Sequence, residues 1–167
     1  VLNNFFHYIF IILIVLFQDQ IKSALIALAS TKFFETTNTS KIDQEIEEVC
    51  VACLALAREK TGALIVFEKN HGLYNYSSSG TRLDSRIHSD LIYSLFQNKS
   101  PLHDGAIIIY NNLIQAAGCF LPLSKNIELD RQFGTRHRAA VGITEISDAV
   151  SIAVSEETGK INICKRG

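Results

Sequence analysis

Residues 101–120 read PLHDGAIIIYNNLIQAAGCF, and this stretch decides the fold. An apolar run at 106–110 is followed by a second run at 113–120, and only two asparagines separate them. Short apolar runs joined by a two-residue polar turn are typical of a β-hairpin. We therefore expect two antiparallel strands here, with a short acidic turn leading into the first of them.

Patterns on either side of this hairpin predict the rest of an α/β domain. Short apolar runs predict further strands at 63–67, 150–154 and 160–164. Apolar residues at helical spacing predict helices from a cap at Ser40 to Gly62, at 86–96 and at 138–146. Residues 68–80 are polar and are expected to form a loop. The order of these elements predicts an α/β fold with a mixed central β-sheet flanked by helices.

The composition indicates a globular domain with no general affinity for nucleic acid. The chain has 167 residues, of which 47% are hydrophobic and 20% charged, and its net charge is −1. A general nucleic-acid binder usually carries a basic surplus, so no nucleic-acid partner is expected. Cys50 and Cys53 form a C-x-x-C inside a helical pattern, and no second pair has zinc-like spacing. We expect the four cysteines to be buried, reduced thiols.

The N-terminal segment is strongly apolar. Residues 5–17 read FFHYIFIILIVLF, which is shorter than the roughly 20 residues of a complete membrane span. No basic residue precedes the run and no cleavage site follows it, which disfavours a signal peptide. We interpret 1–17 as the tail of a truncated transmembrane helix, with a buried core helix as the next alternative. Residues 18–40 are interpreted as an amphipathic helix and a linker, and 41–167 as the globular domain.

The acidic turn before the hairpin is the first candidate for chemistry. Pro101 restricts the loop and Gly105 gives it conformational freedom, so Asp104 is expected at the mouth of a strand. A carboxylate there can bind a divalent cation or accept a proton from a hydroxyl. His103 is a candidate neighbour of the metal. Taken alone, an Asp-Gly pair is more often a simple turn, and the histidine is more often a polar loop residue.

The second candidate is the stretch Gly134-Thr135-Arg136-His137-Arg138, which precedes a predicted helix. A helix N-terminus offers amide donors and the positive end of a dipole to phosphate. One hydroxyl and two forked guanidinium groups add further donors that match phosphate oxygens. The alternative is a helix start with solvated basic side chains.

Weaker patterns complete the set of candidates. In the loop 155–159, Ser155 is a candidate phosphate contact and Glu157 a candidate metal ligand, although a plain hairpin loop is the default. Candidates for an adenine pocket, where an aromatic ring would stack on the base, are Leu83, Asp84, Phe120 and Leu121. The chain has no Walker A, dinucleotide-binding or nucleophile-elbow sequence, so P-loop ATPases, Rossmann dehydrogenases and Ser/His/Asp hydrolases are unsupported.

Four segments together resemble the diadenylate cyclase domain, most closely its membrane-anchored bacterial type. They are TGALIVFE at 61–68, PLHDGA at 101–106, GTRHRAAVG at 134–142 and VSEETG at 154–159. The resemblance covers residues 41–167, and the pairing of Asp-Gly-Ala with Arg-His-Arg is its most specific part. It implies the DAC-domain fold, a hydrophobic anchor before the domain, and a domain that continues past Gly167.

The resemblance implies condensation of two ATP molecules into cyclic di-AMP, with release of two pyrophosphates. Each protomer of a homodimer would bind one ATP, and the 3′-hydroxyl of each ATP would attack the α-phosphate of the other. Asp104 would activate the hydroxyl with Mg²⁺ or Mn²⁺, and Arg136 and Arg138 would act on the phosphates. The implied metal ligands are His103, Asp104 and Glu157. The implied ATP contacts are Leu83, Asp84, Gly105, Ala106, Phe120, Leu121, Gly134, Thr135, Arg136, His137, Arg138, Ser155 and Glu157.

Two other functions stay open at the level of sequence. One is a catalytically silent nucleotide-binding or receptor module linked to the membrane, and the other is an ATP hydrolase. The resemblance implies a protein of the bacterial cell membrane with its catalytic domain in the cytoplasm. It also implies regulatory proteins as further partners.

Overall fold

The computed structural model describes residues 17, 39–126 and 134–167. The predicted membrane helix at 1–17 and the predicted segment at 18–40 fall almost entirely outside these residues. Among the helices that are described, none is long and apolar enough to cross a membrane.

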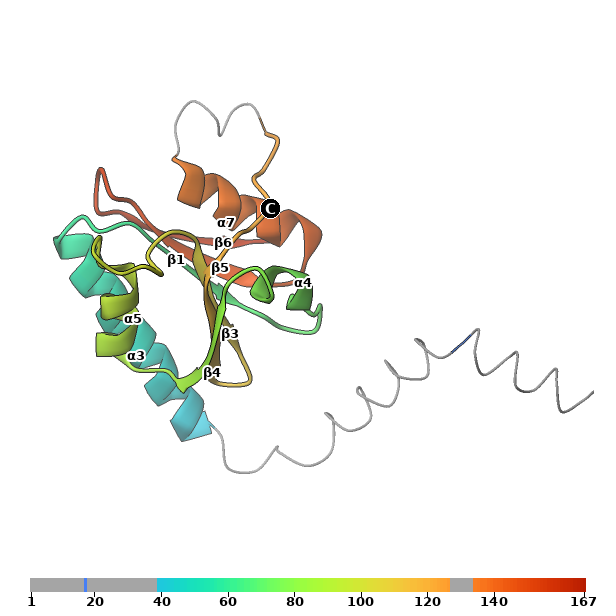
Figure 1. Ribbon diagram of the computed structural model, residues 1–167, viewed down its shortest axis with the longest axis horizontal. Helices are drawn as coiled ribbons and strands as arrows, with labels where there is room; N and C mark the ends of the chain where they lie inside the picture. The colour runs from blue at the N-terminus through green and yellow to red at the C-terminus, as the bar shows by residue number, and fades with distance from the viewer. Residues whose placement is uncertain (1–16, 18–38, 127–133) are drawn as a thin grey trace, which may run out of the picture. The chain divides into compact units, whose positions relative to one another are not determined.

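A six-stranded mixed sheet forms the centre of the domain (Figure 1). In spatial order its strands are β2 (Thr81–Arg86), β4 (Leu113–Cys119), β3 (Ala106–Tyr110), β1 (Ala63–Phe67), β5 (Val150–Val154) and β6 (Ile161–Lys165). β1 and β3 pair in parallel, and the other neighbouring strands are antiparallel. The two central strands read ALIVF and AIIIY because both of their faces are buried. The predicted mixed sheet and the predicted hairpin are confirmed.

Helices cover both faces of this sheet. α3 (Thr39–Arg58) and α5 (Ser89–Phe96) pack on one face, where they share a core cluster with β1, β3 and β4. α7 (Thr135–Ile146) packs on the other face, in a second core cluster to which the short α4 (Tyr74–Ser77) also contributes (Figure 1). The flanking helices predicted from the sequence are therefore confirmed, and the candidate site must be located relative to these two layers.

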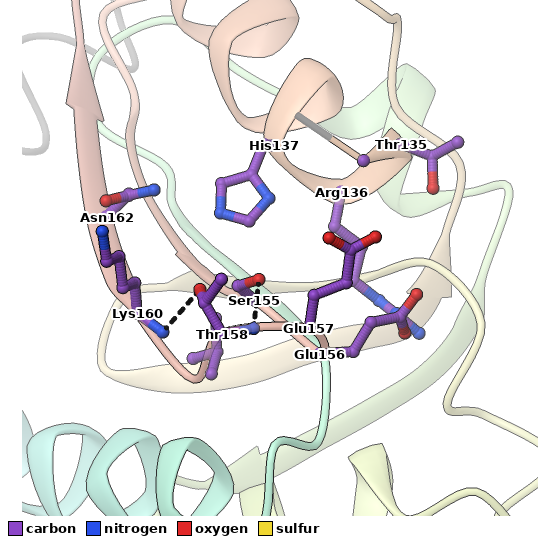
Figure 2. A pocket seen from close by; sticks show the side chains of 11 residues that line it. Thr135, Arg136, His137, Ser155, Glu156, Glu157, Thr158, Lys160 and Asn162 are labelled. Atoms are coloured by element: carbon purple, nitrogen blue, oxygen red, sulfur yellow. Dashed lines mark hydrogen bonds and ion pairs between the residues drawn. The ribbon is translucent and has the colours of Figure 1, made fainter. Parts of the chain in front are cut away.

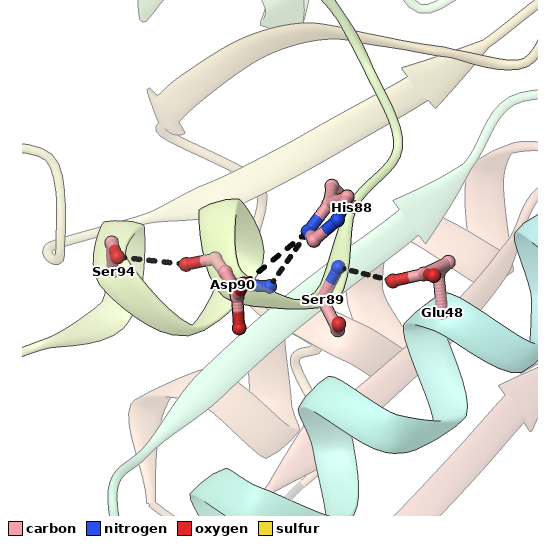
Figure 3. Close-up of polar contacts among 5 residues, drawn as sticks. All are labelled: Glu48, His88, Ser89, Asp90 and Ser94. Atoms are coloured by element: carbon pink, nitrogen blue, oxygen red, sulfur yellow. Dashed lines mark hydrogen bonds and ion pairs between the residues drawn. The ribbon is translucent and has the colours of Figure 1, made fainter.

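The start of α5 is fixed to α3 by polar contacts (Figure 3). The backbone N–H of Ser89 donates to Glu48 Oε2 at 2.7 Å, and hydrogen bonding to Ser89 lowers the pKa of the Glu48 carboxyl. His88 is the N-cap, because its ring Nδ1 accepts from the backbone N–H of Asp90 at 3.3 Å. The helix therefore begins at Ser89 and not at 86 as predicted.

Around β2, one element was missed from the sequence and one prediction is wrong. Residues 81–86 form an edge strand that the sequence did not indicate, because its side chains are mostly polar and only Leu83 packs against a core cluster. The predicted loop at 68–80 contains the single turn of α4. An edge strand with a single half-buried apolar side chain carries almost no periodic apolar signal, which explains why it was missed.

Two predictions about α3 also need correction. The helix begins at Thr39, so Ser40 is part of its first turn and not the residue before it. Cys50 is exposed, which contradicts the expectation of four buried thiols. Cys53 and Cys119 are buried as expected, and burial raises the pKa of each of these thiols to about 11.

Candidate functional site

The first turn of α7 forms the centre of the candidate site. Gly134 is the N-cap, and its carbonyl accepts from the backbone N–H groups of His137 and Arg138 at 3.1 and 3.2 Å. The helix thus begins at Thr135, three residues before the predicted start at 138. Among the residues that the structure describes, no side chain caps this end. Its first amide groups and the positive end of the helix dipole are therefore available to an anion.

Two pockets meet at this turn, and Thr135 and Arg136 line both of them. The first has a volume of about 180 Å³ and is bounded by the start of α7 and the loop after β5 (Figure 2). Its polar lining includes His137, Ser155, Glu156, Glu157, Thr158, Lys160 and Asn162. The second has a volume of about 110 Å³ and is lined by Asp104, Gly105 and apolar residues that include Leu64, Phe120, Leu121 and Ala139. A polar pocket adjoining an apolar one suits a ligand with a charged end and an apolar, aromatic end.

Arg136 is fixed at the junction of the two pockets. Its Nη1 donates to Glu156 Oε2 at 2.7 Å, and its Nη2 donates to the His103 carbonyl at 3.4 Å. The side chain is only 21% exposed, and Nε has no hydrogen-bond partner among the described residues. Gly62 leaves room for this arrangement, because a Cβ there would lie 2.4 Å from Nη1. The guanidinium is therefore held in place before any ligand arrives.

The turn that carries Asp104 depends on Gly105, whose φ is +111°. A Cβ at Gly105 would lie 2.8 Å from the Cys119 carbonyl oxygen, so the close approach of β4 requires glycine. His103 Nδ1 lies 2.6 Å from the Ser100 carbonyl oxygen. Because a carbonyl only accepts, Nδ1 is the donor in this hydrogen bond and Nε2 points elsewhere. The Asp104 side chain is exposed and lines the smaller pocket.

His137 lies in the first turn of α7 and is buried. Burial lowers the pKa of its imidazole below the ordinary value, and the nearby Glu157 carboxylate opposes this shift. The imidazole is therefore neutral at physiological pH. It lines the larger pocket without adding a positive charge to it.

The structure brings most of the predicted residues to the two pockets. They are Asp104, Gly105, Phe120, Leu121, Gly134, Thr135, Arg136, His137, Ser155 and Glu157. Arg138 and Ala106 line neither pocket, and Ala106 is fully buried. His103 lines neither pocket as well, although its carbonyl contacts Arg136.

Leu83 and Asp84 are not brought to the pockets. Leu83 packs against the core cluster on the α3 and α5 face of the sheet, away from α7. Asp84 forms an ion pair with Arg82. No three His, Cys, Asp or Glu side chains of the described residues converge into a metal-binding group. The predicted set of His103, Asp104 and Glu157 is therefore not gathered into a preformed metal site.

Several residues of the site were not predicted. Glu156 belongs to the VSEETG segment, but the sequence did not indicate that it pairs with Arg136. Gly62 was interpreted only as the end of a helix, although it makes room for that pair. Lys160 and Asn162 line the larger pocket, and no motif in the sequence indicated either of them.

Comparison with known proteins gives a family for this geometry. A family model named DAC, described as the nucleotide-binding domain of the DisA bacterial checkpoint controller, matches residues 50–167. The cyclic di-AMP synthase CdaA of Bacillus subtilis (strain 168) is 39% identical over 161 residues, which cover 95% of this chain. The chain spans 59% of the length of that relative.

Solved structures agree with the sequence comparison. The crystal structure of a double mutant of DacA from Staphylococcus aureus is 45% identical and superposes with a TM-score of 0.75. The match covers 77% of this chain and 86% of the other. A structure titled as a hypothetical membrane spanning protein from Bacillus cereus is 42% identical, with a TM-score of 0.71, and the match covers 74% of this chain and 60% of the other.

Proposed function

This chain belongs to the DAC family, and on that premise we propose that it is a diadenylate cyclase. The proposed substrate is ATP, and the proposed products are cyclic di-AMP and pyrophosphate. The observation that carries the proposal is the junction at Thr135 and Arg136, where a polar pocket at a helix N-terminus adjoins an apolar pocket that contains Asp104.

Each pocket suits one part of ATP. The triphosphate is proposed to bind at the uncapped start of α7, where Arg136 and Lys160 contribute positive charge. The nucleoside is proposed to lie in the smaller pocket, where Phe120 is 66% exposed and offers a face for stacking. Arg138 does not line either pocket, so we assign its effect on the phosphates to charge at longer range.

The proposed reaction is two identical phosphoryl transfers. In each one, the 3′-oxygen of one ATP forms a bond to the α-phosphorus of the other, and the bond to the leaving pyrophosphate breaks. The Asp104 carboxylate accepts the proton of the attacking hydroxyl. Arg136 offsets the negative charge that develops on the phosphate, and its existing contacts mean that little reorganisation is needed.

A divalent cation, Mg²⁺ or Mn²⁺, is proposed as the cofactor. Such ions are commonly held by one or two carboxylates together with substrate phosphates, so a preformed cluster of protein ligands is not required. Asp104 and Glu157 supply exposed carboxylates at the two pockets. His103, which lines neither pocket, is proposed as a further ligand through Nε2. The cation would neutralise charge on the phosphates.

We propose a homodimer as the active form, because each protomer offers one nucleotide site and the reaction joins two nucleotides. A place at the bacterial membrane is supported by the apolar run at 5–17 and by the Bacillus cereus relative described as membrane spanning. A cytoplasmic position of the catalytic domain is proposed from the family resemblance. Regulatory proteins that bind the domain are proposed from the family resemblance alone.

A product assay tests this proposal. The full chain is incubated with ATP and either Mn²⁺ or Mg²⁺, and nucleotides are separated by chromatography; a chelator added to a parallel sample is the control. We expect cyclic di-AMP and pyrophosphate in a ratio of one to two. ADP or AMP without the cyclic dinucleotide would identify a hydrolase, and unchanged ATP would identify a silent binding module; either result contradicts the proposal.

A further inference from the structure

One flank of α3 is apolar and exposed. Val49, Cys53 and Leu56 point into the core, and Glu48 and Glu59 contact α5. At four-residue spacing on a different side of the helix lie Ile46, Cys50 and Leu54. Ile46 is 49% exposed and Leu54 is 53% exposed, with Val51 beside them at 50%. A helix that is already packed on a sheet and paired with α5 thus has a further apolar flank without cover among the described residues.

The outer strand of the sheet extends this apolar surface. Ile161 and Ile163 of β6 pair with Val154 and Ile152 of β5, and these partners pack in the core cluster that contains α3. Residues directly opposite in an antiparallel pair share a face, so Ile161 and Ile163 face the α3 side of the sheet. They are 37% and 70% exposed. The turn between β5 and β6 touches the end of α3, because a Cβ at Gly159 would lie 2.5 Å from the Ala57 carbonyl oxygen.

We call this surface the α3 strip, and it consists of Ile46, Cys50, Val51, Leu54, Ile161 and Ile163. Exposed apolar side chains that gather on one surface of a soluble domain often mark an interaction site. The pockets described above are built around α7 on the other face of the sheet. The α3 strip is therefore separate from the proposed catalytic site.

The charges along α3 indicate which partner fits. Asp43 and Glu47 are exposed toward its start, and Arg58 and Lys60 are exposed at and just beyond its end. If two α3 helices lie antiparallel with Cys50 facing Cys50, then Ile46 faces Leu54, and Asp43 faces Ala57 and so comes next to Arg58, twice by symmetry. A parallel pair would instead place like charges opposite each other. The surface is self-complementary only in the antiparallel arrangement.

We propose that the α3 strip is a self-association surface on which α3 of a second copy packs antiparallel. This surface is separate from the one through which two nucleotide sites would face each other in the catalytic dimer. Two independent surfaces on one chain would allow catalytic pairs to be linked into larger assemblies. The chain itself supplies the probe, because Cys50 is exposed at the centre of the strip while Cys53 and Cys119 are buried.

The test is thiol cross-linking of the full chain in mild detergent with a short bismaleimide. We expect a cross-linked dimer that is lost in Cys50→Ser. The dimer should be retained in Cys164→Ser, because Cys164 packs against the core cluster on the α7 face of the sheet. Leu54→Asp should lower the yield at least about tenfold, since a charge would be buried at the contact. A yield unchanged by Leu54→Asp, or the absence of any Cys50-dependent dimer, would overturn the proposal.

A charge exchange tests the antiparallel orientation. Asp43→Arg and Arg58→Asp should each lower the cross-linking yield by about fivefold, which corresponds to about 1 kcal/mol. The double variant should restore it. If the double variant stays as low as the single ones, the proposed orientation is wrong. Because these residues lie outside the nucleotide pockets, cyclase activity measured on the same samples separates failure of this proposal from failure of the proposed function.

Discussion

At the scale of single residues, Gly62 shows how a residue with no side chain sets the position of a functional one. A Cβ at this position would lie 2.4 Å from Arg136 Nη1 and 3.0 Å from Glu156 Oε2. The Arg136–Glu156 ion pair can therefore form in its present place only next to glycine. The glycine lies between α3 and β1, far along the chain from both partners, so its role is visible only in the folded domain.

Replacing Gly62 by alanine should displace the Arg136 guanidinium and lower kcat by about 100-fold, since small displacements of a positioning group carry costs of this size. The fold should persist, because the clash is with a side chain. Gly72→Ala is the matched control, as the nearest atom to a Cβ there is 3.9 Å away. Steady-state rates of cyclic di-AMP synthesis by both variants check this prediction. Full activity of Gly62→Ala would show that catalysis does not depend on the observed position of the Arg136 guanidinium.

His137 should make the stability of the domain depend on pH. Its folded pKa is lowered by burial, whereas in the unfolded chain it is about 6.5. Between these two values only the unfolded state binds the proton, so the free energy of unfolding is highest above about pH 6.5 and falls as the pH drops toward the folded pKa. Melting temperatures at about pH 7.5 and 5.5 should differ more in the wild type than in His137→Gln. Equal differences would contradict this assignment.

At the scale of elements, α7 is held by the segment that follows β4. The backbone N–H of Ser124 donates to the Arg138 carbonyl at 2.9 Å, and Ser124 Oγ donates to Glu145 Oε1 at 2.7 Å. Gly142 permits this contact, because a Cβ there would lie 2.2 Å from the Pro122 carbonyl oxygen. The orientation of the whole helix therefore depends on the close contact between its backbone at Gly142 and the backbone at Pro122. The first turn of α7, which forms the site, is positioned by the same contact.

Gly142→Ala should force α7 away from residues 122–124. Overpacking of this kind costs about 1–3 kcal/mol, so the melting temperature should fall clearly below that of the wild type and of Gly72→Ala. Because the clash is with backbone, it cannot be relieved by a side-chain rotation. Calorimetry checks the prediction. A melting temperature equal to that of Gly72→Ala would show that the close packing of α7 against residues 122–124 does not require glycine at position 142.

The elements also show what the sequence could and could not predict. β1, β3 and β5 were predicted at their observed bounds, because β1 and β3 are continuous apolar runs and β5 is apolar except for Ser151. β2 was missed because an edge strand with polar side chains has no such run. The start of α7 was placed too late because its first turn is polar and faces the pockets. The roles of Gly62 and Glu156 depend on contacts across the fold, which no local pattern contains.

At the scale of the whole molecule, the proposed reaction requires two nucleotide sites to face each other. A monomer would bind ATP without forming product, so the rate per protomer should rise with protein concentration until pairing saturates. Assays over a wide range of protein concentration at saturating ATP check this prediction. A rate strictly proportional to concentration throughout, with a monomer found by light scattering under the same conditions, would contradict an active dimer.

The most direct test of the account is to measure cyclic di-AMP synthesis and ATP binding side by side for the wild type and Asp104→Asn. The substitution keeps the shape of the side chain and removes the carboxylate at the smaller pocket. The account predicts that the wild type forms cyclic di-AMP, and that the variant binds ATP with similar affinity but forms almost none. Synthesis by the variant at close to the wild-type rate would contradict the role assigned to Asp104 and the catalytic site built around it.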